Sequence, residues 1–219
     1  RAKGIGFLCA SMFLISRMAY YQIGQVLGLM ETMALWMAIL VLWYLFRYLN
    51  EKDSPVCFYI SCLLYFGVCF VHERYMALFP LLLLVLLFKK SRKLWEWGAG
   101  LASFLLVQII RAFTIGSILP AGTGGTQVAD TFSLSDTFKY ALSQIAYVFG
   151  INAGPEHLNG CPWGQSPLVV KGLVLMADAA IAVIVLAFAA KLVREKRKEY
   201  RVRMLKNSAL FILFTGLCI

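Results

Sequence analysis

The sequence predicts an all-α fold, a polytopic bundle of about seven transmembrane helices. Hydrophobic residues make up 61% and charged residues 15% of the 219 residues, whereas a soluble domain carries charge on about a quarter of its residues. Apolar runs at residues 26–46 and 167–190 reach the ~20 residues that a helix needs to cross the hydrocarbon core. Because these runs do not alternate with polar residues, we expect helices rather than barrel strands.

Basic clusters set the order of the predicted spans. Lys and Arg concentrate in four groups between the apolar runs, at residues 1–3, 47–52, 89–93 and 191–206. Since cytoplasmic loops are enriched in Lys and Arg, all four groups belong on the cytoplasmic side. The net charge of +10 therefore reflects membrane orientation, and no nucleic-acid partner is expected. This arrangement needs seven crossings, which we place at residues 4–16, 26–46, 55–71, 75–88, 97–118, 167–190 and 207–219.

The first predicted span follows Arg1 and Lys3. These residues and the apolar run after them are similar to the charged and apolar regions of a signal peptide, but no A-x-A cleavage site follows, so a short span is favoured. The chain begins with Arg rather than Met, and residues 207–219 stop within an apolar run. We therefore interpret residues 1–219 as a single transmembrane domain and a fragment of a longer protein.

The third and fourth predicted spans, residues 55–71 and 75–88, form a short hairpin. At a rise of 1.5 Å per residue they reach about 26 Å and 21 Å, against a core of roughly 30 Å. His72, Glu73 and Arg74 then lie at the turn near the outer interface. The alternative is one helix over residues 55–88, which would be about 51 Å long and would centre three ionisable groups in the bilayer. It would also place residues 89–93 outside, so the hairpin is the preferred prediction.

Residues 119–166 form the longest non-apolar segment and are predicted to be an extracytoplasmic loop. Ser133 and Asp136 are spaced as a capping box, and the apolar spacing that follows predicts a helix over residues 134–149. Such an amphipathic helix either lies in the membrane interface or packs on the ends of the spans. Its predicted apolar stripe consists of Phe138, Leu142, Ile145 and Phe149.

Polar side chains suited to chemistry gather on the predicted outer side. Arg offers a forked donor to phosphate oxygens, His can donate or transfer a proton, and a carboxylate can act as a general base. This mixture is typical of a site for an anionic lipid headgroup with a polar adduct. The candidates are Arg17, Glu31, His72, Glu73, Arg74, Tyr75, Arg111, Glu156 and His157.

Structural roles for these ionisable residues are the alternative. Glu73 and Arg74 could pair with neighbouring spans, and Glu31 could be satisfied locally by Thr32 or Arg17. For Asp178, within the sixth predicted span, a structural partner is favoured over catalysis. No set of residues has the spacing of a zinc site or of a phosphate-binding glycine loop.

Residues 20–88 carry a family resemblance. They contain Tyr20-Tyr21, residues 28–32 at the start of a long span, His72-Glu73-Arg74-Tyr75 after a short apolar helix, and a leucine-rich helix through Pro80. This order resembles the central spans of bacterial members of the GT-C superfamily, multi-span glycosyltransferases that use polyprenyl-phosphate-linked sugars. The resemblance covers about a third of the chain.

The resemblance implies sugar transfer from a polyprenyl-phosphate donor to a glycan, lipid or protein acceptor. The reaction is expected on the outer face of a bacterial cytoplasmic membrane, as part of the cell envelope. His72, Arg74 and Tyr75 would hold the donor, with Arg111 or Arg17 assisting, and Glu156 and His157 are further substrate-binding candidates.

The resemblance does not identify a catalytic base within these residues. Members of the family carry their hallmark acids in a first large outer loop, so the base is expected upstream of Arg1. Glu31 and Glu73 are the weaker candidates within the chain. No cofactor is evident, although a divalent cation at that acidic loop is compatible with the family. The alternatives are a polysaccharide polymerase or ligase and a non-catalytic transporter or scaffold.

Overall fold

The computed structural model describes residues 7, 11, 26–51, 55–116, 133–149 and 167–218. Over these residues the chain is helical and contains no strand, so the predicted all-α class is confirmed. The chain divides into two compact units. The first unit comprises Arg1–Ala121 and Leu205–Cys218, and the second comprises Gly122–Met204 with Ile219.

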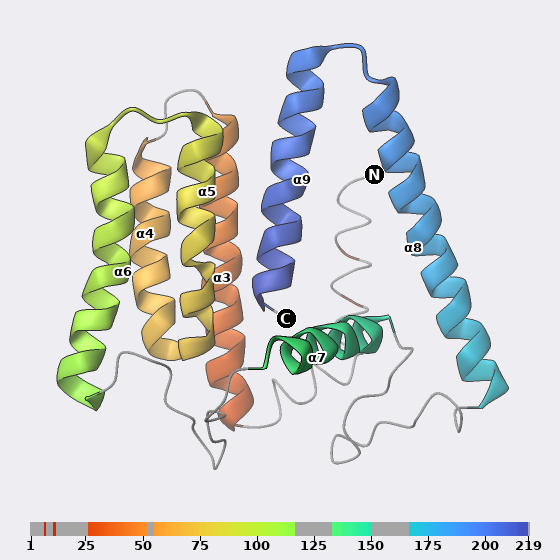
Figure 1. Cartoon of the computed structure of the whole chain (residues 1–219), viewed down its shortest axis with the longest axis horizontal. Helices are drawn as coiled ribbons and strands as arrows, with labels where there is room; N and C mark the ends of the chain where they lie inside the picture. The colour runs from red at the N-terminus through yellow and green to blue at the C-terminus, as the bar shows by residue number, and fades with distance from the viewer. Residues whose placement is uncertain are drawn as a thin grey trace. The chain divides into compact units, whose positions relative to one another are not determined.

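Four α-helices and a 3₁₀ helix form most of the first unit. Helices α3 and α4 lie side by side, α5 packs against α3, and α6 packs against α4 and α5 (Figure 1). The bounds are α3 Val26–Asn50, α4 Pro55–Val71, η1 Glu73–Leu78, α5 Phe79–Lys89 and α6 Leu94–Ile115.

The predicted turn at His72 is confirmed, and a single helix over residues 55–88 is wrong. His72 is extended, with φ −150° and ψ 118°, and its Nδ1 accepts a hydrogen bond from the backbone N–H of Arg74. The chain then forms η1 before α5 begins at Phe79, four residues later than the predicted span. Pro80 suits that start, because a proline in the first helical turn lacks only an N–H that would have no partner within the helix.

A continuous apolar core joins the helices of the first unit. On α3 the buried residues recur at helical spacing, from Ala34 and Ala38 through Val41 and Leu45 to Tyr48. Buried leucines of α5 and the aromatic rings of α4 complete the core, and the rings of Phe79 and Phe104 stack at a centroid distance of 4.3 Å.

The second half of α9 (Lys198–Cys218) closes this unit. Asn207 and Asn50 exchange reciprocal side-chain hydrogen bonds of 3.0 Å and 3.2 Å. The rings of Phe211 and Phe46 lie 5.9 Å apart, and Leu210 is fully buried. The end of the described chain is therefore anchored to the first long helix of the unit.

Three of the described helical segments are long and apolar enough to cross a membrane, namely Gly28–Asn50, Leu94–Thr114 and Leu168–Arg194. Helix α4 is apolar but has 17 residues, and α5 has 11. Helix α9 begins nine residues before the predicted seventh span and so includes part of the basic segment. The structure therefore supports a membrane protein with three candidate spans, and the seven-span bundle stays a prediction. Apart from residues 7 and 11, the predicted first span lies outside the described residues.

In the second unit, helix α7 (Leu134–Val148) confirms the helix predicted over residues 134–149. The backbone N–H of Asp136 donates to Ser133 Oγ at 3.3 Å, which is one half of a capping box. The apolar stripe of α7 is exposed on the protein. Its burial against apolar material, either in a membrane interface or on the ends of the spans, stays a prediction. The exposed residues are Phe138, Leu142, Ile145 and Phe149. Helix α8 (Leu168–Arg194) has no buried residue.

Candidate functional site

Five ionisable side chains from three parts of the first unit meet at one end of its helices. Glu31 lies near the start of α3, His72 precedes η1, Glu73 and Arg74 open η1, and Arg111 lies in the last turns of α6. We call these residues the ionic cluster. All five are among the candidates predicted from the sequence, although nothing in the sequence indicated which would pair.

The buried half of the cluster is the ion pair between Arg111 and Glu73. Arg111 Nη2 donates to Glu73 Oε2 at 3.1 Å, and the Arg111 side chain is only 3% exposed. A cation so far from water requires a nearby anion, because removing an unpaired charge from water costs several kcal/mol. This pair joins α6 to the first residue of η1 and so fixes the position of the residue that follows, Arg74.

The open half of the cluster is centred on Glu31. Its Oε1 lies 3.7 Å from Arg74 Nη2 and 3.9 Å from His72 Nε2, both beyond hydrogen-bonding distance. The Arg74 side chain is 43% exposed. Arg74 and His72 are therefore held loosely against the carboxylate, and an incoming anion could replace it as their partner.

Tyr75 lies beneath these two residues rather than at the surface. It is 5% exposed, its ring lies edge-on to that of His72 at 6.1 Å, and the Arg74 guanidinium lies 5.8 Å from its centroid. The hydroxyl of Tyr65 donates to the Met76 carbonyl at 3.2 Å, which ties η1 to α4. The buried Tyr75 ring thus contacts His72 and Arg74 on the side that faces the protein interior.

Gln108 is a polar residue near the cluster that the sequence analysis did not single out. It lies one turn before Arg111 on α6, and its amide donates to Met76 Sδ at 3.5 Å. The side-chain oxygen of Gln108 is buried and has no hydrogen-bond partner among the described residues. The sequence could have indicated Gln108, because it lies three residues before Arg111 and so on the same helical face of an otherwise apolar span.

Three of the predicted site residues, Arg17, Glu156 and His157, lie outside the described residues. Asp178 lies on α8, in the second unit. The hydroxyl of Thr32, a predicted local partner of Glu31, donates to the Gly28 carbonyl at 2.8 Å.

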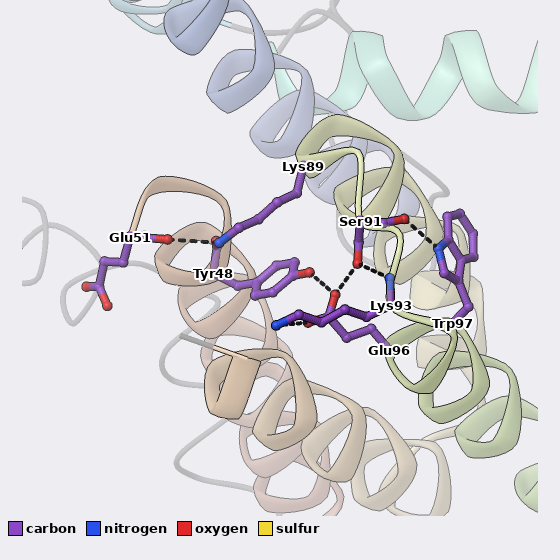
Figure 2. Close-up of polar contacts among 7 residues, drawn as sticks. All are labelled: Tyr48, Glu51, Lys89, Ser91, Lys93, Glu96 and Trp97. Carbon is purple, nitrogen blue, oxygen red and sulfur yellow. Dashed lines mark hydrogen bonds and ion pairs between the residues drawn. The ribbon is translucent and has the colours of Figure 1, made fainter. Parts of the chain in front are cut away.

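A second polar cluster lies at the opposite end of the same helices and centres on Glu96, which is 2% exposed (Figure 2). The hydroxyls of Tyr48 and Ser91 both donate to Glu96 Oε2, and Lys93 Nζ lies 3.9 Å from Oε1. Trp97 Nε1 donates to the Ser91 carbonyl at 3.1 Å. These contacts join the end of α3, the α5–α6 turn and the start of α6, so the role of Glu96 is structural.

Lys89 extends this second cluster to the α3–α4 turn. Its ammonium donates to the carbonyls of Tyr48 and Glu51 and lies 4.2 Å from the centre of the Tyr48 ring. Glu51 also accepts from the guanidinium of Arg47, and this hydrogen bond lowers the pKa of the Glu51 carboxyl. The basic residues at this end are thus partly used to satisfy exposed backbone carbonyls.

The residue types in the ionic cluster are ones that can bind an anion and transfer a proton. Two guanidiniums and an imidazole converge with two carboxylates, and the described residues contain no group of three or more His, Cys, Asp or Glu that could hold a metal ion. No protein-family model, curated protein or solved structure gives a significant match to the chain. The site must therefore be interpreted from its own residues.

Proposed function

We propose that this chain belongs to a membrane glycosyltransferase that moves a sugar from a polyprenyl-phosphate donor to an acceptor on the outer face. The observation that carries the proposal is the loose contact of Arg74 and His72 with Glu31 at one end of the first unit. Such a half-exposed guanidinium, anchored by a buried Arg111–Glu73 pair, suits a phosphate held at a membrane surface.

The topology that goes with this proposal is a seven-span bundle in a bacterial cytoplasmic membrane. Arg47 and the basic turn at residues 89–93 lie at the end of the unit that carries Glu96, which the positive-inside rule assigns to the cytoplasm. The ionic cluster lies at the other end and so faces the outer leaflet. Lipid-linked phosphates could reach it there from the bilayer.

In the proposed reaction the acceptor's hydroxyl oxygen attacks the anomeric carbon of the donor sugar. The bond between that carbon and the phosphate oxygen breaks, and polyprenyl phosphate leaves with the electron pair. Arg74 offsets the growing charge on the phosphate, with His72 as a second donor. The hydroxyl proton passes to a carboxylate. Within the described residues Glu31 is better placed for this than Glu73, because Glu73 is held by Arg111 at 3.1 Å.

The test is sugar transfer by the full-length protein in detergent, with Arg74→Lys and Arg74→Ala variants. Lys keeps the charge but loses the planar fork. Losing a charge-assisted hydrogen bond costs about 1.5–3 kcal/mol, so we expect roughly a ten- to hundredfold loss of transfer. Arg47→Ala is the matched control, because it removes an exposed arginine that pairs with Glu51 at the other end of α3.

Each outcome separates the alternatives. Full activity of both Arg74 variants would show that this residue does not bind the donor. Equal loss in Arg47→Ala would point to a general effect of removing an arginine rather than to donor binding by Arg74. Transfer of whole glycan chains rather than single sugars would favour a polysaccharide polymerase or ligase, and binding of the donor without any transfer would favour a transporter or scaffold.

A further inference from the structure

The turn between α8 and α9 contains a basic cavity that the proposed reaction does not use. This cavity is an open surface pocket of about 620 Å³ within the second unit, and its lysine and arginine residues are exposed. It is formed by the last turns of α8 and the three residues before α9. Its lining residues are Ala187, Ala190, Lys191, Arg194, Glu195, Lys196 and Arg197.

Four cations line this cavity, and none of them forms an ion pair with another residue that the structure describes. The carboxylate in the lining, Glu195, accepts the backbone N–H of Arg197 at 3.0 Å and so is occupied locally. Lysines and arginines in the last turn of a helix are favoured by its dipole, which accounts for Lys191 and Arg194. The dipole of α8 does not account for Lys196 and Arg197, which lie beyond its end.

The remaining lining is apolar and continues along α8. Ala187 and Ala190 lie on the same helical face as Lys191 and Arg194, and Val183 and Ile184 extend that face by one turn. Val183 is 65% and Ile184 is 68% exposed. A ligand that fills the cavity and follows this face needs an anionic group joined to a hydrocarbon chain.

We propose that the α8–α9 turn binds the phosphate headgroup of an anionic phospholipid. The acyl chains would follow the exposed face of α8, the most apolar of the candidate spans. Orientation by the positive-inside rule requires charges near the end of a span, but it does not require a cavity that gathers four of them. The inference depends on α8 crossing the membrane and does not rest on the proposed glycosyl transfer.

The experiment measures lipids retained by the full-length protein taken from nanodiscs that contain phosphatidylcholine and phosphatidylglycerol. Native mass spectrometry counts each lipid bound. The Arg194→Gln/Arg197→Gln variant is compared with a matched control, Lys90→Asn/Arg92→Gln, which removes two exposed cations from the α5–α6 turn. Asn is chosen because Lys90 has a φ of 54°, which Asn tolerates. Nanodiscs expose both faces, so a change in orientation cannot alter the result.

Wild type should retain phosphatidylglycerol in preference to phosphatidylcholine. Each basic side chain near an anionic lipid surface contributes roughly fivefold, so the Arg194/Arg197 variant should bind phosphatidylglycerol about thirtyfold more weakly. The control should change little. Unchanged retention by the variant, or equal loss in the control, would overturn the proposal. Displacement of the lipid by glycerol phosphate at matched concentration would show that the ligand need not be a lipid, because the acyl chain would then contribute nothing to binding. This result would also overturn the proposal.

Discussion

Two arginines of similar position in the ionic cluster have different physical roles. Arg111 is 3% exposed and contacts Glu73 at 3.1 Å, whereas Arg74 is 43% exposed and lies 3.7 Å from Glu31. Partly exposed pairs contribute up to about 1 kcal/mol to stability, while breaking a buried pair costs about 3–5 kcal/mol. Stability should therefore depend on Arg111, and ligand binding on Arg74.

We expect Arg111→Met to destabilise the protein by about 2–3 kcal/mol. This cost lies at or just below the lower end of the range of about 3–5 kcal/mol for buried pairs, because the Glu73 side chain left behind is 30% exposed and can be partly hydrated. The measurement is thermal unfolding in detergent, with Glu73→Gln and the double variant completing a cycle. The double variant should be less destabilised than the sum of the two single changes. Strict additivity would show that the two residues do not interact.

Glu96 offers a similar test at the other end of the unit. Glu96→Ala leaves the nearly buried Tyr48 hydroxyl without its acceptor and should cost about 2 kcal/mol in thermal unfolding. Glu96→Gln keeps an acceptor oxygen and should cost less. The control is Glu51→Ala, an exposed carboxylate on the same side, which should change stability little. Equal stability of Glu96→Ala and wild type would contradict a structural role.

At the scale of elements, the sequence predicted where helices break better than where they begin. The turn at His72 was predictable because three ionisable residues separate two apolar runs. The start of α5 was not, because residues 73–78 form a 3₁₀ helix that apolar periodicity does not distinguish from an α-helix. The early start of α9 was missed because hydropathy marks only the apolar half of a helix whose first half is charged.

The cap of α7 can be tested by hydrogen exchange. Ser133→Ala removes the oxygen that accepts the Asp136 N–H and should weaken the first turn by about 1 kcal/mol. The amides at the start of α7 should then exchange roughly fivefold faster. Ser135→Ala is the control, because this exposed serine does not cap the helix. Faster exchange in the control, or none in Ser133→Ala, would show that the cap does not stabilise α7.

At the scale of the whole molecule, the sequence named the members of the ionic cluster but not their pairing. His72, Glu73 and Arg74 were found because charge between apolar runs is costly and so conspicuous. The pairing of Glu73 with Arg111, 38 residues away, depends on how α6 packs, which periodicity does not specify. Glu96 was overlooked because it follows a run of basic residues that was attributed to orientation alone.

Orientation in the membrane is the prediction that concerns the whole chain. In a background that lacks the six natural cysteines, Ser135→Cys on α7 should react with a membrane-impermeant thiol reagent in intact cells. Arg92→Cys should react only after lysis, because its basic turn is assigned to the cytoplasm. Protection of Ser135→Cys in intact cells together with labelling of Arg92→Cys would reverse the orientation and remove the ionic cluster from the outer face.

The discontinuity of the first unit affects how the protein is made. The asparagine pair joins residues 157 positions apart, so Gly122–Met204 of the second unit are synthesised before Asn207 can meet Asn50. Until then, the part of α3 around Asn50 and Phe46 lacks its neighbours on α9. A nascent chain that fails to deliver α9 would display this surface to membrane proteases. A defect in α9 would thus be sensed through α3, a helix synthesised well before it.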